Sequence, residues 1–157
     1  MIRTARRADL PALRAIQAEA LAEPWQELLT VAVDGPPILL VDADPDPVGY
    51  ALCVASDGSG RQAETDEAPA DGSGDATAYL AELAVAAGYR GERRGSALLA
   101  SLEDRLRASG YERLRLTVRA VDRRAISFYL DRAFERRDRL PDHYETGDGL
   151  LLGKPLR

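Results

Sequence analysis

The sequence contains little of what disulfide-bonded, metal-binding or membrane-spanning proteins are built from. Its 157 residues include one cysteine and one histidine, so they offer neither an internal disulfide nor a cysteine–histidine metal centre. Cys53 lies in the apolar run 49–55, and we expect a buried small side chain in a reducing compartment. No stretch approaches the roughly 20 apolar residues of a transmembrane helix. Residues 1–7 lack the apolar centre of a secretory signal, so we expect a cytoplasmic protein.

Several motifs of common enzymes are missing as well. A phosphate-binding loop needs a lysine after its second glycine, and the single lysine, Lys154, lies near the C-terminus. There is no Gly-x-Ser-x-Gly hydrolase motif, and Gly91 and Gly95 do not have Rossmann spacing. The 26 acidic and 21 basic residues give a formal charge of −5, whereas domains dedicated to nucleic acids are usually basic. We expect no nucleic acid and no membrane among the partners.

The chain is long enough for one domain with a core of ordinary size. Hydrophobic periodicity and turn residues predict the order β-α-α-β-β-β-α-β-α-β-β. The expected elements lie at 2–5, 10–21, 24–29, 38–41, 48–55, 78–86, 92–109, 112–118, 122–132, 134–137 and 149–152. Residues 56–76 contain no aliphatic side chain larger than alanine, so we expect a mobile loop there.

The most informative segment is 78–100. An apolar run at 80–85 enters a basic turn containing Gly91, and Gly95 opens a helix whose leucines recur at helical spacing. The turn carries three arginines, Arg90, Arg93 and Arg94. Because the unpaired N–H groups of a helix start attract anions, this arrangement predicts a phosphate-binding site.

A second group of residues follows one strand later. Asp122 stands where the next helix should begin, Tyr129 comes seven residues after it, and Phe134 five beyond that. Seven residues make two helical turns, so Asp122 and Tyr129 lie on one face. Asp122 is a typical N-cap residue, and a tyrosine on an apolar helix face would by itself be a core residue.

These two segments resemble those of the GCN5-related N-acetyltransferase (GNAT) superfamily, and the similarity covers essentially the whole chain. Residues 90–95 are similar to the acyl-CoA motif Arg/Gln-x-x-Gly-x-Gly/Ala, with Arg93 in place of the middle glycine. Asp122 stands for the usual asparagine, and Ala133 replaces the glycine of the Gly-Phe pair. The resemblance implies a single GNAT domain over 1–157, of the α/β (α+β) class. Its central sheet should be mixed, mostly antiparallel, of about seven strands and flanked by helices.

The resemblance also implies acetyl-CoA as cosubstrate, with no metal. The residues expected to bind it are Leu83, Ala84, Val85, Arg90, Gly91, Glu92, Arg93, Arg94, Gly95, Ser96, Asp122 and Tyr129. The superfamily places the tyrosine hydroxyl near the thioester sulfur, so Tyr129 is the expected proton donor to the departing thiolate. Glu82 is the single acid between residues 76 and 91, and we expect it to deprotonate the amine; alternatively, it faces outward. Acetyl transfer should be direct, because Cys53 looks too buried to carry an acyl group.

The C-terminal segment bears on the acceptor. His143-Tyr144, followed by Asp148 and an apolar run, resembles the tail of protein N-terminal amine acetyltransferases of the RimI type. That resemblance implies an aromatic pair in a loop that holds the acceptor, so His143 and Tyr144, with Glu82, are the expected substrate-binding residues. We expect a protein or peptide N-terminal amine as acceptor. Two alternatives stay open, a small-molecule amine acetyltransferase and a non-catalytic acyl-CoA-binding module, and the protein could be a monomer or a homodimer.

Overall fold

The computed structural model describes residues 1–21, 24–35, 37–55, 76–145 and 147–156. The mobile loop expected at 56–76 lies, except for Ala76, outside these residues. In chain order the elements are β1 (Ile2–Thr4), η1 (Arg7–Asp9), α1 (Leu10–Ala20), α2 (Gln26–Ala32), β2 (Ile38–Ala43), β3 (Pro47–Ala55), β4 (Thr77–Val85), η2 (Ala87–Tyr89), α3 (Arg94–Ala108), β5 (Arg113–Arg119), α4 (Arg123–Leu130), β6 (Glu135–Tyr144) and β7 (Gly147–Pro155). The predicted order of helices and strands is confirmed.

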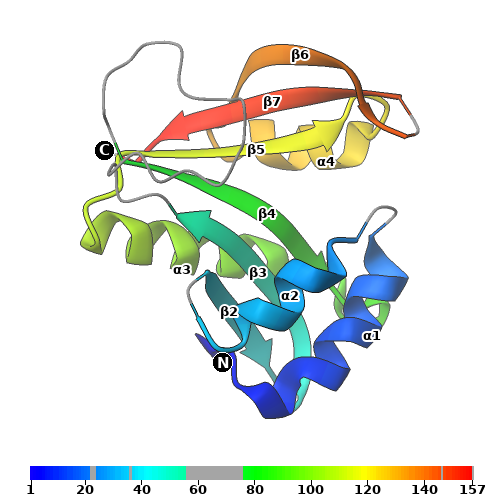
Figure 1. Ribbon diagram of the computed structural model, residues 1–157, viewed down its shortest axis with the longest axis vertical. Helices are drawn as coiled ribbons and strands as arrows, with labels where there is room; N and C mark the ends of the chain where they lie inside the picture. The colour runs from blue at the N-terminus through cyan, green and yellow to red at the C-terminus, as the bar shows by residue number, and fades with distance from the viewer. Residues whose placement is uncertain (22–23, 36, 56–75, 146, 157) are drawn as a thin grey trace.

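One seven-stranded sheet has the strand order β1-β2-β3-β4-β5-β7-β6. The expected mixed, mostly antiparallel sheet is confirmed, since the β4–β5 pair is parallel and the other pairs are antiparallel. Helices α1 and α2 cover one face of the sheet, and α3 and α4 lie on the other (Figure 1). We call these the α1–α2 face and the α3–α4 face.

Each face of the sheet has its own hydrophobic core. Successive side chains of a strand point to opposite faces, so Leu40 and Cys53 join the core under α3, whereas Leu39 and Tyr50 join the one under α1 and α2. The strands β2 and β3 therefore read as continuous apolar runs, as expected of strands buried on both faces. Cys53 is fully buried, as the sequence predicted.

The strands β4 and β5 pair over only part of their length. Their register runs from Thr77 with Arg113 to Leu80 with Leu116, although β4 continues to Val85. Beyond the paired part the two strands diverge (Figure 1). This divergence parts the sheet in its middle.

A β-bulge lies where the divergence begins. Opposite β3, Cys53 pairs with Leu80 and Leu52 with Glu82, so Ala81 is an extra residue in β4. A bulge shifts the alternation of side chains, and Glu82 consequently lies on the α1–α2 face although Leu80 faces α3. Periodicity alone would have put both residues on one face.

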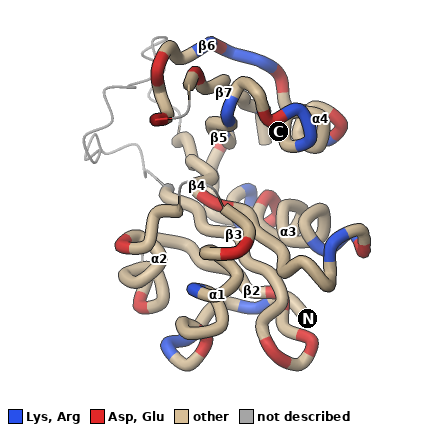
Figure 2. Tube along the Cα trace, turned by 90° about the vertical axis from the view of Figure 1, so that its right-hand side faces the viewer, with Lys and Arg blue, Asp and Glu red and all other residues tan. Residues whose placement is uncertain are grey.

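The last hairpin differs from the prediction. We expected a strand at 134–137 and a loop holding His143 and Tyr144, but β6 extends to Tyr144, so both residues belong to a strand. Most of β6 is exposed and carries a run of basic residues (Figure 2), so it lacks the apolar alternation that marks a strand. As an edge strand it can also contain Pro141, which an inner strand would exclude.

Candidate active site

The start of α3 offers backbone donors without acceptors. Its N-cap residue, Arg93, makes no side-chain capping bond, and the first backbone bond of this turn runs from Ala97 N to Arg93 O at 3.0 Å. Within the described part of the chain, the amides of Arg94, Gly95 and Ser96 have no assigned acceptor. The start of α4 is different, because the Ala125 amide donates to Asp122 Oδ1 at 3.1 Å. The uncapped start of α3 therefore fits an anion.

Arg93, which stands where the acyl-CoA motif has its middle glycine, adopts a backbone conformation that favours glycine. Its φ is 62°, in the left-handed region, where a non-glycine residue costs roughly 1–2 kcal/mol. Its side chain is exposed, and the neighbouring Gly91 also has a positive φ, of 82°. A Cβ on Gly95 would meet Phe128 at 3.6 Å and Val85 at 3.9 Å, which is ordinary contact. Its protein neighbours therefore do not require a glycine at position 95.

Arg94, which we predicted to bind phosphate, forms ion pairs with three carboxylates of the protein. Its guanidinium contacts Asp44 at 2.6 Å and both Asp42 and Glu92 at 3.0 Å. These contacts, with Asp44 foremost, raise the pKa of Arg94. The side chain thus fastens the β2–β3 turn to the start of α3.

Arg90 also has partners within the protein. Its Nε donates to the Val85 carbonyl at 3.0 Å, and its Nη2 lies 3.7 Å from Glu19 Oε1. Both arginines stand beside the α3 start as predicted, yet their cationic groups are directed at protein oxygens.

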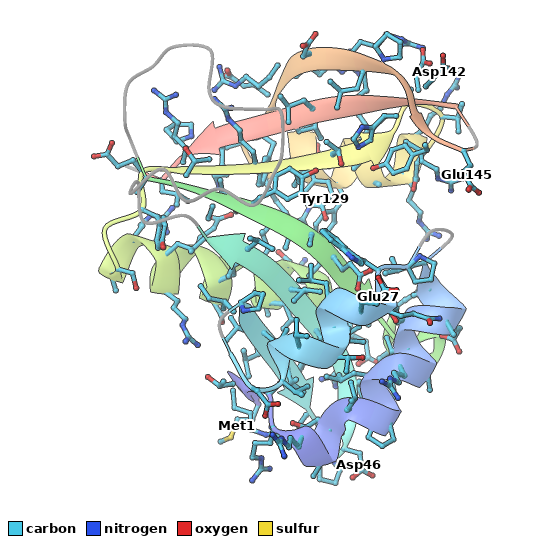
Figure 3. The ribbon with its side chains drawn as sticks, in the orientation of Figure 1. Met1, Glu27, Asp46, Tyr129, Asp142 and Glu145 are labelled. Carbon is cyan, nitrogen blue, oxygen red and sulfur yellow. The ribbon has the colours of Figure 1, made fainter. Side chains whose placement is uncertain are left out.

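Tyr129 is buried on α4, and Figure 3 shows it between the ribbons of β4 and β5. Its ring packs edge-on against Phe128 and Phe134, at centroid distances of 5.1 and 5.3 Å. Burial raises the pKa of Tyr129, the nearby Asp122 raises it further, and Arg132 opposes both. Among the residues that the structure describes, none forms a hydrogen bond with its hydroxyl. The phenol is therefore kept protonated and available as a donor.

Glu82 is 7% exposed, so the alternative of an outward-facing side chain is wrong. Three donors hold its carboxylate: Gln17 Nε2 at 2.8 Å and the Tyr50 hydroxyl at 2.9 Å on Oε1, and the Trp25 amide at 2.7 Å on Oε2. A carboxylate has about four lone-pair positions, so one position on Oε2 remains. Burial and the Glu82 carboxylate raise the pKa of Tyr50, which stays a donor.

Three hydroxyl groups, from Tyr79, Thr117 and Tyr144, form a chain across the sheet. Tyr144 donates to Thr117 Oγ1 at 3.1 Å, and the Tyr79 hydroxyl lies 2.7 Å from the same oxygen. Thr117, on β5, therefore connects β4 to β6, which lies on the far side of β7. Tyr144 is also close enough to Tyr129 to contribute to the raised pKa of that residue.

His143 and Tyr144 pack edge-on against each other, with centroids 4.8 Å apart. A Cβ on Gly149 of β7 would come within 3.1 Å of both rings. The absence of a side chain at this position therefore leaves space for the two rings. His143 is exposed and Tyr144 half-buried. The structure thus brings Tyr144 to the neighbourhood of Tyr129 and leaves His143 at the surface.

The other predicted residues occupy the parted strand and the turn after it. Leu83 and Val85 pack against the α3–α4 core, Ala84 lies in the α1–α2 core, and Ser96 Oγ accepts from Arg132 Nε at 3.2 Å. The sequence prediction missed Gln17 and Thr117. Gln17 is 1% exposed, and a polar residue on an apolar helix face was a usable signal. Thr117 gave no signal, because a threonine suits any strand.

Comparisons with known proteins agree with this fold. The family model described as "Acetyltransferase (GNAT) family" matches residues 2–134. A search of curated proteins found no significant match to the sequence. No helix in the described ranges is long and apolar enough to span a membrane.

Three solved structures illustrate the similarity in fold. The ribosomal-protein-S18-alanine N-acetyltransferase from Escherichia coli is 24% identical, with a TM-score of 0.79 over 99% of this chain and 93% of its own. Arabidopsis thaliana NAA60 in complex with acetyl-CoA is 17% identical, with a TM-score of 0.82 over 99% and 97%. Arabidopsis thaliana Naa50 in complex with the bisubstrate analogue CoA-Ac-MVNAL is 22% identical, with a TM-score of 0.77 over 98% and 97%.

Proposed function

This chain belongs to the acetyltransferase (GNAT) family, and we propose that it transfers the acetyl group of acetyl-CoA to the α-amine of a peptide or protein. The cosubstrate, when bound, supplies an acetyl group activated as a thioester. We assign its binding to the end of β4 and the turn that follows, and this assignment rests on the uncapped amides at the start of α3. The binding residues would be Leu83, Ala84, Val85, the turn 90–96, Asp122 and Tyr129.

The proposed chemistry rests on one observation, that Tyr129 is buried and its hydroxyl stays protonated. Acetyl transfer to an amine releases a thiolate, which must take up a proton. Tyr129 is buried, its pKa is raised, and its hydroxyl has no partner among the described residues. A group that stays protonated in a water-poor setting suits a general acid, and we assign that role to Tyr129.

The attacking amine must also lose a proton. We propose that Glu82 accepts it at the remaining position on Oε2. Because Gln17, Tyr50 and the Trp25 amide fix the carboxylate, Glu82 cannot swing toward a substrate. This fixed geometry favours proton transfer through a bridging water.

The acceptor side of the proposal rests on Tyr144 and, to a lesser degree, His143. Tyr144 is held by Thr117 and lies close to Tyr129, as a residue beside the reacting amine should. The comparison structures point to the same acceptor class, since one is named for ribosomal-protein alanine and another holds a peptide-like bisubstrate analogue. An α-amine, with a pKa near ~8, is also easier to deprotonate at neutral pH than a lysine amine near ~10.4.

The test is to follow thiol release from acetyl-CoA with peptides varied at their first two residues and with a panel of small amines. Peptides should be the better substrates, and Tyr144→Ala should raise their KM while sparing the KM of acetyl-CoA. If small amines outperform every peptide, the acceptor class is wrong. If CoA binds but no amine is acetylated, the protein is a binding module.

A matched pair of variants tests the cosubstrate site separately. Gly95→Asp places a negative charge at the α3 start and should abolish the rise in Tm caused by CoA. Gly95→Ala, whose Cβ would make only ordinary contacts, should fold and keep a smaller or equal rise. A Gly95→Asp protein that folds and binds CoA normally would show that the site lies elsewhere.

A further inference from the structure

The start of α3 carries less free positive charge than the sequence suggests. Arg94 is shared among three carboxylates, and Arg90 is held by Glu19 and the Val85 carbonyl. The three carboxylates thus share the Arg94 guanidinium, and one of them, Asp42, also contacts the Met1 ammonium at 3.2 Å. A phosphate at the free amides would therefore gain little from Arg94.

Another cation, Arg132, reaches the same place from the turn that follows α4. The Arg132 Nε donates to Ser96 Oγ in the first turn of α3, at 3.2 Å. Its Nη1 donates to the Phe128 carbonyl at 2.8 Å, and its guanidinium lies 3.8 Å from the centre of the Phe128 ring. In the described part of the chain, no carboxylate lies within ion-pair distance of Arg132.

The surroundings fix this side chain in position. The Phe128 ring would lie 3.6 Å from a Cβ on Gly95, so Phe128 and Arg132 together pack against the opening turn of α3. A guanidinium stacked on a ring and bonded at two nitrogens has lost most of its rotamer freedom before a ligand arrives. Further N–H groups of the guanidinium remain to be shared.

We propose that Arg132 is a phosphate-binding residue of the cosubstrate site and supplies the cation that pairs with the pyrophosphate of CoA at the α3 start. This inference rests on the acetyl-CoA binding proposed above. Spacing along the sequence does not suggest this role, because Arg132 lies in the second segment, far along the chain from the acyl-CoA motif. The pyrophosphate is the phosphate concerned, because Arg132 contacts the residue whose own amide is free, Ser96.

Arg132 also lies close to Tyr129, the proton donor that we propose. Arg132 follows Tyr129 by three residues, in the turn after α4, where its amide donates to the Tyr129 carbonyl at 2.9 Å, and its charge opposes the rise in the pKa of Tyr129. A phosphate that neutralises Arg132 removes this opposition. Binding of the cosubstrate would then favour the protonated tyrosine that the reaction needs.

The experiment measures binding, independent of turnover, by titration calorimetry with three ligands: CoA, 3′-dephospho-CoA and pantetheine. Arg132→Met keeps an unbranched stem against Phe128 and removes the charge. Its Kd for CoA and for 3′-dephospho-CoA should rise about ten-fold, as expected for one charge-assisted hydrogen bond, and its Kd for pantetheine should not change. Arg124→Met removes the same charge from an exposed position on α4 and should leave all three values within two-fold of wild type. Arg132→Gln replaces Arg132→Met if the latter does not fold.

The outcomes separate this inference from the function on which it rests. A wild-type protein that binds neither CoA nor 3′-dephospho-CoA would overturn the cosubstrate site itself. Wild-type binding with an unchanged Kd in both Arg132 variants would overturn only the role of Arg132. A loss seen with CoA but not with 3′-dephospho-CoA would overturn the pyrophosphate assignment in favour of the 3′-phosphate.

Discussion

Replacing Tyr129 with phenylalanine distinguishes a catalytic role of the hydroxyl from a packing role. The structure predicts a large loss of kcat and almost no loss of stability. Phenylalanine keeps the edge-on contacts with Phe128 and Phe134. The lost hydroxyl has no hydrogen-bond partner among the described residues, so its removal should change the free energy of unfolding by less than about 0.5 kcal/mol. As a general acid, by contrast, the hydroxyl is worth about 10- to 1,000-fold in kcat, within or near the usual range for proton transfer.

Tyr50→Phe is the matched control, since both tyrosines are buried and differ in whether the hydroxyl is paired. The Tyr50 hydroxyl donates to the Glu82 carboxylate at 2.9 Å, and a hydrogen bond to a charged group contributes about 1.5–3 kcal/mol. Urea unfolding should therefore show a clear loss for Tyr50→Phe and almost none for Tyr129→Phe.

The kinetic assay is thiol release at saturating acetyl-CoA and acceptor. A raised pKa for Tyr129 means that the acid stays protonated beyond pH 10, the ordinary value, so its deprotonation should not lower kcat below that pH. An unchanged kcat in Tyr129→Phe would refute the acid role. Normal kcat with lowered stability would identify the hydroxyl as part of the core.

Three further predictions concern other polar contacts. Glu82→Gln should lower the free energy of unfolding by about 1–3 kcal/mol in urea titrations, because an amide cannot accept from all three of its donors; an unchanged midpoint would contradict the network. Thr117→Val should raise the KM of the acceptor several-fold without changing acetyl-CoA affinity, because it removes the hydrogen bond that Tyr144 donates to Thr117. Thr117→Ser should restore the KM, and failure of that rescue would argue for a packing effect. Asp9 accepts two bonds from Arg3 at 2.8 Å, which lowers the pKa of Asp9. Asp9→Asn should therefore be destabilised by about 1–3 kcal/mol at pH 7, and the difference from wild type should shrink as the pH falls below the ordinary value of 3.8; a constant difference down to pH 2 would contradict the ion pair.

The sequence predicted those parts of the fold whose pattern follows from burial. Residues 48–53 are buried on both faces, and the leucines of α3 sit at helical spacing on one core, so both elements were recognisable. The edge strand β6 was not, because an exposed strand needs no apolar alternation and its stability comes from pairing with β7. The error at His143 and Tyr144 follows directly from this.

The positions of the candidate site residues were predicted better than their partners. Arg94 does stand at the start of α3, but two of the carboxylates paired with it, Asp42 at the end of β2 and Asp44 in the following turn, come from some 50 residues earlier. Sequence spacing reports neighbours along one element and says little about side chains that meet across the fold. For the same reason it could not find Arg132 beside Ser96.

The bulge at Ala81 determines the face of the sheet on which Glu82, the proposed proton acceptor, lies. A regular β4 would have put Glu82 on the face of Leu80, in the α3–α4 core, where no described donor awaits a carboxylate and burial would be costly. The extra residue turns Glu82 to the face that supplies Gln17 and Tyr50, while Tyr129 stays on the other side of the sheet. Pairing of β4 with β5 ends at Leu80, next to the bulge, so the sheet parts close to Glu82, the proton acceptor that we propose. Deletion of Ala81 should therefore keep Glu82 on its present face, because Leu80 and Glu82 would become neighbours in a regular strand and would still point to opposite faces. Activity retained in that variant would show that the face of Glu82, and not the bulge itself, is what the reaction needs.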